Sequence, residues 1–243
     1  LPNGDKTGDP RNVGVTNVHH FYTRRNLFAL AAFAFKLKTP QKYIDVISTA
    51  TVISRMYRFR SQNSSLGAGG GPLNGTLYIP SLSKEIPILK AIKEHITKSH
   101  NVAHILSNIS PNSISTGSHT ELTNIASNCM QYIFTDPPFG SNLIYSELNL
   151  IWEAWLNVFT GNKHEAVISN SQRKKLQDYQ DLMTGCFKEA YRILRPGHWI
   201  TVEFHNSKNA VWNSIQEALL SAGFVIADVR TFDKQQGSYN QVN

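Results

Sequence analysis

Apolar residues recur at helical spacing in several stretches of the chain. The clearest stretch is 179–194, where an i, i+3, i+4 pattern runs from end to end. The same spacing predicts four further helices, over about 24–37, 88–106, 146–159 and 211–222. Strand and helix compete over 43–57, and the spacing of the isoleucines there favours a helix. Thr23 is placed to cap the first helix, and Gly223 to cap the last.

Short apolar runs predict the strands. The run that ends at Thr135 is typical of a buried strand, because Pro137 and Pro138 forbid its continuation. Three more strands are expected, over Gly75–Pro80, Trp199–Phe204 and Phe224–Phe232. From Tyr132 onward the order is therefore strand, helices, strand, helix, strand. This alternation predicts an α/β fold with a parallel sheet and crossover helices.

The chain of 243 residues is long enough for one substantial core, so one domain over 19–243 is expected. Residues 1–18 are rich in Gly, Pro, Asn and Asp, and are expected to form an extended segment at its start. A Gly-rich insertion lies at about 61–74. Polar residues precede it and Pro72 follows its glycines, so it is interpreted as a flexible surface loop and not as a cofactor loop.

The formal net charge of +7 suits a polyanionic partner, although many basic domains bind no nucleic acid. Arg55, Arg58 and Arg60 form a basic cluster that is either a solvated face or a phosphate contact. The two cysteines, Cys129 and Cys186, lie far apart in sequence, which argues against a disulfide framework and a zinc site and fits a reducing cytoplasm. No metal is expected, and the longest apolar run is too short to cross a membrane.

The most informative stretch is Asp136-Pro137-Pro138-Phe139, which follows the predicted strand at 132–135. Carboxyl ends of strands are where open α/β sheets place their ligand sites. A site that makes an amine nucleophilic must accept hydrogen bonds from it without donating competing ones. The carboxylate of Asp136 and the carbonyl of Pro137 supply two acceptors, and neither proline has an N–H group. The ring of Phe139 offers a face on which an extruded base can stack.

This motif resembles the Asp-Pro-Pro-Tyr/Phe motif of S-adenosylmethionine-dependent amino-methyltransferases, which act on adenine N6 or cytosine N4 in DNA. The longer run TDPPFGSNLIYSELNLIWEAWL is similar to bacterial site-specific DNA methylases, in which a loop, an aromatic-Ser/Ala-Glu-Leu step and a Trp-rich helix follow the motif. FYTRRNLFALA near the start and RPGHWITVEFHNS further on extend the resemblance over most of Val18–Gln241.

The resemblance implies a Rossmann-like methyltransferase fold, with a mostly parallel sheet and flanking helices. It implies S-adenosylmethionine as the cofactor, DNA as the partner, and a role in restriction-modification or a related system. It also implies that the catalytic residues are Asp136, Pro137, Pro138 and Phe139. Asn142 and Tyr145 lie closest to the motif and are candidates for contacting the target base. The tryptophans of the helix that follows are interpreted as core residues.

The chain departs from the family in one respect. Family members bind the cofactor mainly through a Phe-x-Gly-x-Gly loop after the first strand, and the sequence contains no such loop between a strand and a helix. Ser118 and His119 stand where the family often has an acidic residue near the cofactor. The cofactor-binding residues therefore stay unknown. The sequence is expected to be a fragment, with its first strand and cofactor loop in an upstream part of the same protein, and inactive by itself.

The leading hypothesis is transfer of a methyl group to an exocyclic amine of a DNA base, by direct in-line attack of the amine and without a cysteine nucleophile. Two alternatives stay open. One keeps the chemistry but changes the substrate to RNA or a protein glutamine amide; those branches more often begin the motif with Asn. The other is a non-catalytic nucleic-acid-binding module. Residues between Arg55 and Asn112 are the best candidates for target recognition.

Overall fold

A computed structural model of the chain describes residues 1–36, 41–59, 70–106 and 113–231. The chain divides into two compact units. Unit 1 contains Leu1–Gly117 and Pro137–Tyr179, and unit 2 contains Ser118–Asp136 and Gln180–Asn243. The helices in the described part of the chain are too short or too polar to cross a membrane.

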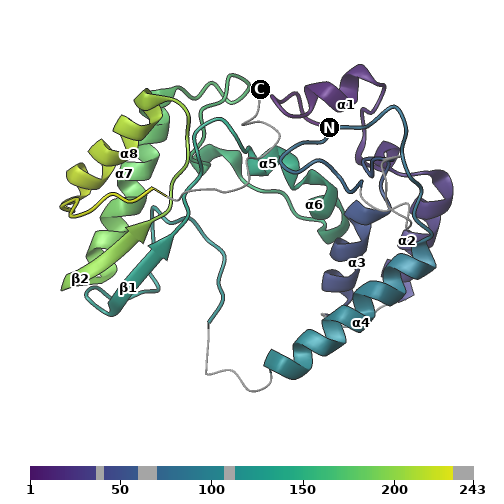
Figure 1. Cartoon of the computed structure of the whole chain (residues 1–243), viewed down its shortest axis with the longest axis horizontal. Helices are drawn as coiled ribbons and strands as arrows, with labels where there is room; N and C mark the ends of the chain where they lie inside the picture. Colours follow the sequence, from purple (N-terminus) through teal and green to yellow (C-terminus); the bar gives the residue numbers. More distant parts are fainter. Residues whose placement is uncertain (37–40, 60–69, 107–112, 232–243) are drawn as a thin grey trace. The chain divides into compact units, whose positions relative to one another are not determined.

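Unit 1 is helical (Figure 1). Its elements in chain order are α1 (Gly8–Asn12), η1 (Val18–Phe21), α2 (Arg24–Lys36), α3 (Gln41–Val52), α4 (Ile88–Leu106), α5 (Tyr145–Leu148), α6 (Leu150–Leu156) and η2 (Asn162–His164). The predicted helices over 24–37, 43–57 and 88–106 are thus confirmed, with small changes in their ends. The expected helix over 146–159 is present as two short helices, α5 and α6, which meet at Asn149.

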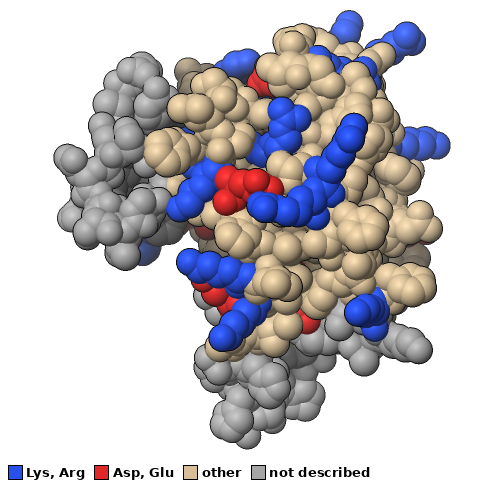
Figure 2. All heavy atoms as spheres, turned by 90° about the vertical axis from the view of Figure 1, so that its right-hand side faces the viewer, with Lys and Arg blue, Asp and Glu red and all other residues tan. Residues whose placement is uncertain are grey.

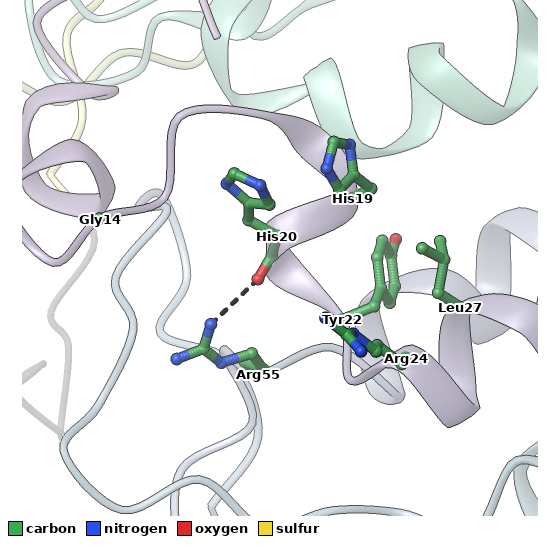
Figure 3. A pocket seen from close by; sticks show the side chains of 7 residues that line it. All are labelled: Gly14, His19, His20, Tyr22, Arg24, Leu27 and Arg55. Atoms are coloured by element: carbon green, nitrogen blue, oxygen red, sulfur yellow. Dashed lines mark hydrogen bonds between the residues drawn. The ribbon is translucent and has the colours of Figure 1, made fainter.

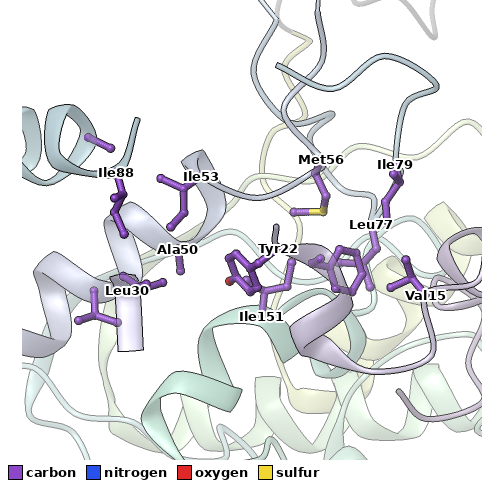
Figure 4. Close-up of a cluster of buried hydrophobic side chains, with 13 residues drawn as sticks. Val15, Tyr22, Leu30, Ala50, Ile53, Met56, Leu77, Ile79, Ile88 and Ile151 are labelled. Carbon is purple, nitrogen blue, oxygen red and sulfur yellow. The ribbon is translucent and has the colours of Figure 1, made fainter. Parts of the chain in front are cut away.

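The core of unit 1 joins segments that are far apart in sequence (Figure 4). Leu30 of α2, Ala50 of α3 and Ile151 of α6 are all buried in it. The tryptophans of α6 pack against the same core, as expected. The indole N–H of Trp152 donates to the hydroxyl of Thr51 at 2.7 Å. The indole N–H of Trp155 donates to the hydroxyl of Tyr22 at 3.1 Å.

Helix α2 begins as the sequence predicts. The hydroxyl of Thr23 accepts a hydrogen bond from the backbone N–H of Asn26 at 3.3 Å, which satisfies a donor that the first turn leaves free. Asn26 itself is buried and donates its side-chain N–H to the carbonyl of Ile53 at 3.1 Å. The first turn of α2 is therefore fixed both by its cap and by the chain that follows α3.

The described residues of unit 2 form a two-stranded parallel sheet and two helices (Figure 1). Strand β1 (Met130–Thr135) pairs with β2 (Leu194–Val202), and Ile133 lies opposite Ile200. Helix α7 (Leu176–Ile193) connects the strands, and its residues from Gln180 onward belong to this unit. Helix α8 (Asn209–Ala222) follows β2. The α/β class and the parallel pairing are confirmed, whereas the complete Rossmann-like sheet stays a prediction.

Helices α7 and α8 lie side by side. Gln180 of α7 donates to the carboxylate of Glu217 of α8 at 2.9 Å. Helix α8 ends as predicted at Gly223, whose left-handed backbone lets the N–H groups of residues 223 and 224 bond the last turn. Cys186 of α7 is half-buried, and burial raises the pKa of its thiol to about 11, so the thiol stays protonated near neutral pH.

The segment before β1 is held by an ion pair on α7. Glu189 and Arg192 of α7 lie 2.8 Å apart. The Arg192 guanidinium donates to the carbonyls of Leu122 and Ile125 at 2.8 and 3.0 Å. The Glu189 carboxylate accepts the backbone N–H of Leu122 at 2.8 Å. One helical turn of α7 therefore fixes the path of the chain into β1.

The expectation that the strand before the motif is buried was wrong. Tyr132 and Phe134 of β1 are 54% and 60% exposed, and Trp199 of β2 is 65% exposed. These side chains share one face of the sheet, where the Tyr132 hydroxyl also donates to the Thr201 hydroxyl at 2.7 Å. Ile133 and Thr135 point to the opposite face and are half-buried. The apolar run of β1 therefore forms a strand of which only one face is covered by other residues.

Three other expectations also differ from the structure. Residues 1–18 are not extended throughout, because Gly8–Asn12 forms α1 and Val15 is buried in the core. Gly75–Pro80 is not a strand, although Leu77 and Ile79 alternate inward, because no described segment pairs with it. The described part of 224–232 is likewise irregular, and Val225 is 87% exposed. The Gly-rich insertion at 61–74 lies mostly outside the described residues.

Candidate active site

The Asp-Pro-Pro-Phe motif begins where β1 ends, as the sequence predicts. Thr135 is the last residue of β1, and its carbonyl accepts the backbone N–H of Glu203 at 2.9 Å. Asp136 follows directly and its side chain is exposed. Its carboxylate is thus presented at the carboxyl end of a parallel strand, which is where sheets of this type place ligands.

The rest of the motif belongs to unit 1, because the division between the units falls at the Asp136–Pro137 peptide bond. Pro137 is buried, whereas Pro138 and Phe139 are half-buried. Gly140 is buried and has a φ of +75°, a left-handed conformation that favours glycine. The two prolines and this glycine give the turn a defined path, and the prolines add no N–H donor to it.

Two contacts from later in the chain hold the turn in place. The hydroxyl of Tyr179 donates to the carbonyl of Pro138 at 2.5 Å. The backbone N–H of Ile168 donates to the carbonyl of Gly140 at 3.2 Å. Burial raises the pKa of Tyr179 well above its usual range, against the effect of a hydrogen bond with the Gly140 backbone, so the phenol stays protonated and able to donate.

Tyr179 also distinguishes the two prolyl carbonyls. The Pro138 carbonyl is occupied by the tyrosine hydroxyl. In the described part of the chain, the Pro137 carbonyl accepts no hydrogen bond. Of the two carbonyls, Pro137 is therefore the one that has no donor among the described residues. The role assigned to it from the sequence, as an acceptor for an amine, stays a prediction.

The two candidates for contacting the target base lie on the surface of unit 1. Asn142 is exposed in the loop after the motif. Tyr145 opens α5 and is 46% exposed, whereas its neighbour Ile144 is buried and anchors the loop. Both polar groups are therefore available to a ligand. Their role in base contact stays a prediction.

Sequence reasoning missed Glu147, which is 5% exposed and organises the region after the motif. Its carboxylate accepts the backbone N–H groups of Asp5, Lys6 and Thr7 at 3.1, 2.7 and 3.2 Å. Gly4 lies so close that a Cβ there would overlap the carboxyl group. The only signal in the sequence was the aromatic-Ser-Glu-Leu step itself, because the partners lie about 140 residues away.

A second carboxylate supports the start of α5. Glu165 accepts the backbone N–H of Ser146 at 2.9 Å and its hydroxyl at 2.6 Å. The side-chain N–H of Gln172 donates to the same carboxylate at 2.7 Å. Because Ser146 and Glu147 are adjacent, the carboxylates of Glu165 and Glu147 together fix the first turn of α5, next to Tyr145. Hydrogen bonds through Ser169, Ser171 and Gln172 connect the two carboxylates.

The three arginines of the predicted basic cluster, Arg55, Arg58 and Arg60, do not share one environment. Arg58 donates its Nε–H to the carbonyls of Gly70 and Gly71 at 3.2 and 3.1 Å, so it has a structural role. Arg55 is exposed, and Arg60 lies outside the described residues. Within the described ranges, no group of three His, Cys, Asp or Glu side chains is arranged to hold a metal ion.

A comparison with models of protein families matches residues 130–243 to the DNA methylase family of the N6/N4 type. This part of the chain is similar to the DNA methylase family. The methylase-family region contains the motif at 136–139, the positioning residue Tyr179, both strands and helices α7 and α8. Comparisons with curated proteins and with solved structures match nothing.

The cofactor that this family generally uses, S-adenosylmethionine, requires a particular arrangement of strand, loop and helix. A strand that leads into a glycine loop and then a helix would supply backbone N–H groups to S-adenosylmethionine. Of the described strands, β1 leads into Asp-Pro-Pro-Phe-Gly, and β2 leads into 203–208, which contains no glycine. The described residues of this chain therefore do not fit the cofactor.

Proposed function

We propose that the chain carries the amine-binding part of a DNA methyltransferase, which acts on the N6 amine of adenine or the N4 amine of cytosine. The single observation that carries the proposal is the position of Asp136-Pro137-Pro138-Phe139, at the carboxyl end of a parallel strand and inside the region that matches the DNA methylase family. Restriction-modification, or a related system, is the setting that this similarity favours.

In this proposal, the residues of the chain orient the amine. The Asp136 carboxylate and the Pro137 carbonyl each accept one of the two amine hydrogens, so the nitrogen lone pair turns away from the ring and becomes nucleophilic. Phe139 stacks on the extruded base, and Asn142 and Tyr145 contact its edge. The methyl group comes from S-adenosylmethionine, whose binding residues we place in another part of the protein.

The decisive test replaces Asp136 with Ala in the intact protein. We expect the rate of methyl transfer from labelled S-adenosylmethionine to duplex DNA to fall by about 100-fold or more, since the amine loses one of its two acceptors. Mass spectrometry of the digested DNA identifies the product as N6-methyladenine or N4-methylcytosine. Asp228→Asn is the control, because Asp228 is exposed and pairs only locally with Arg230 at 2.7 Å.

An unchanged rate in Asp136→Ala would contradict the proposal. The two alternatives give other results. Methylation of RNA or of a protein glutamine, with DNA left unmodified, would favour the change of substrate. If the intact protein does not bind S-adenosylmethionine by calorimetry and still binds DNA, the non-catalytic module would be favoured.

A further inference from the structure

A pocket of about 440 Å³ opens in unit 1 where η1 meets α2 (Figure 3). Two arginines line it, Arg24 from the first turn of α2 and Arg55 from the segment after α3. The imidazole rings of His19 and His20 lie on a second side, and Tyr22 and Leu27 add apolar wall. Its volume lies within the range of ligand pockets, about 300–1,000 Å³.

The charges in this pocket are not balanced by the protein. Within the described ranges, neither Arg24 nor Arg55 pairs with a carboxylate. The Arg55 guanidinium instead donates to the backbone carbonyl of His20 at 3.1 Å, which directs it across the pocket wall (Figure 3). The carboxylate of Glu85 is already engaged, because Arg25 lies 3.1 Å from it and the Thr23 hydroxyl donates to it at 2.7 Å.

The surroundings of the pocket favour an extended anion. Arg24 belongs to the first turn of a 13-residue helix, so the helix dipole adds positive potential at the same place. Lys and Arg side chains also gather on the face of unit 1 that Figure 2 shows, and acidic side chains are fewer there. Lys90 and Lys93 of α4 are exposed. A polyanion satisfies both the pocket and this wider surface.

We propose that Arg24 and Arg55 bind a phosphate of the DNA backbone in this pocket. Guanidinium groups match phosphate oxygens geometrically, and the imidazole N–H groups of His19 and His20 are further donors. Such a contact positions the duplex without reading its sequence. The inference deepens the proposed function and rests on it, because that function makes DNA the substrate.

The test measures binding of the full chain to a fluorescein-labelled 20-base-pair DNA duplex, by anisotropy, at several concentrations of KCl. We expect Arg24→Gln and Arg55→Gln each to weaken binding about fivefold or more. Each substitution should also lower the slope of log affinity against log salt by about one, the change expected for one lost phosphate contact.

Two variants with the same change of charge are the controls. Arg25→Gln alters the neighbouring residue of the same helix turn, whose side chain is paired with Glu85. Lys36→Gln alters the exposed far end of α2. Both should bind the duplex within about twofold of the wild-type chain. Thermal unfolding tests whether Arg55→Gln folds. Arg24→Gln keeps the test valid if it does not, because Arg24 is exposed and forms no ion pair within the described ranges.

Equal weakening by the pocket variants and the controls would overturn the inference in favour of diffuse charge. Absence of saturable duplex binding by the wild-type chain would also overturn it. The inference would also be overturned if the chain bound an RNA of the same length more tightly than the DNA duplex, and if Arg24→Gln weakened binding to that RNA only. The assay needs no methyl transfer. An intact protein that binds DNA through the pocket but does not methylate it therefore supports this inference and contradicts the proposed function.

Discussion

The hydroxyl of Tyr179 donates a 2.5 Å hydrogen bond to the carbonyl of Pro138. The tyrosine is fully buried, and the two residues lie 41 positions apart in sequence. This contact ties the start of α7 to the middle of the Asp-Pro-Pro-Phe turn. A part-buried hydrogen bond of this kind restricts the turn more than solvent-exposed loop contacts do.

Tyr179→Phe is expected to destabilise the protein by about 1–2 kcal/mol, because the Pro138 carbonyl loses its donor. We also expect methyl transfer by the intact protein to slow at saturating DNA, with little change in the DNA concentration that gives half-maximal rate, since the turn loses its fixed position. Urea unfolding and steady-state kinetics measure the two effects. Tyr191→Phe, on the same helix and half-exposed, is the control and should change neither quantity. If Tyr179→Phe lowered the free energy of unfolding but left the maximal rate of methyl transfer unchanged, Tyr179 would have a structural role only.

Glu147→Gln is expected to destabilise the protein by about 3 kcal/mol. The buried carboxylate accepts three backbone N–H groups, and an amide would present its own N–H to some of them. Urea unfolding followed by tryptophan fluorescence gives the free energy of unfolding. Glu94→Gln is the matched control, because Glu94 is exposed and its contact with Lys90 is 3.9 Å long. A loss no larger than that of the control would show that residues 5–7 do not depend on this carboxylate.

The stability of unit 2 should depend on pH through Glu189. Hydrogen bonds from Arg192 and from the Leu122 backbone lower the pKa of this carboxyl to about 2, from an ordinary value of 4.5. The folded state therefore prefers the ionised form. The stabilisation is complete above about pH 4.5 and is lost as pH falls towards 2. Comparison of urea midpoints for the wild type and Glu189→Gln at pH 7, 5 and 3 isolates this group. The difference between them should shrink only below pH 5, and a difference independent of pH would contradict the assignment.

The helices were predictable because their signals are local. The i, i+3, i+4 pattern of 179–194 and the caps at Thr23 and Gly223 lie within or beside the elements they define. The motif at 136–139 was also visible, since two prolines after an apolar run end a strand in any context. The predicted position of Asp136, at the end of β1, follows from the same rule.

What could not be predicted depends on partners far away in sequence. The exposure of Phe134 is set by which elements cover the sheet, and the apolar run itself is the same for a covered and an uncovered strand. Leu77 and Ile79 alternate as strand residues do, but no described strand pairs with them. The roles of Glu147 and Tyr179 are long-range as well. Tyr179 belongs to the apolar pattern of 179–194, but that pattern does not show that its hydroxyl donates to the Pro138 carbonyl.

The unpaired edges of the two-stranded sheet, together with its exposed face, have a practical consequence for handling the chain. Met130–Thr135 is an uncharged six-residue segment rich in β-forming residues, and within the described residues β1 and β2 are each paired along one edge only. Segments of this kind are templates for edge-to-edge stacking between molecules. Concentrated samples should therefore form fibrillar aggregates that bind thioflavin dyes. A lysine in place of Phe134 should delay them.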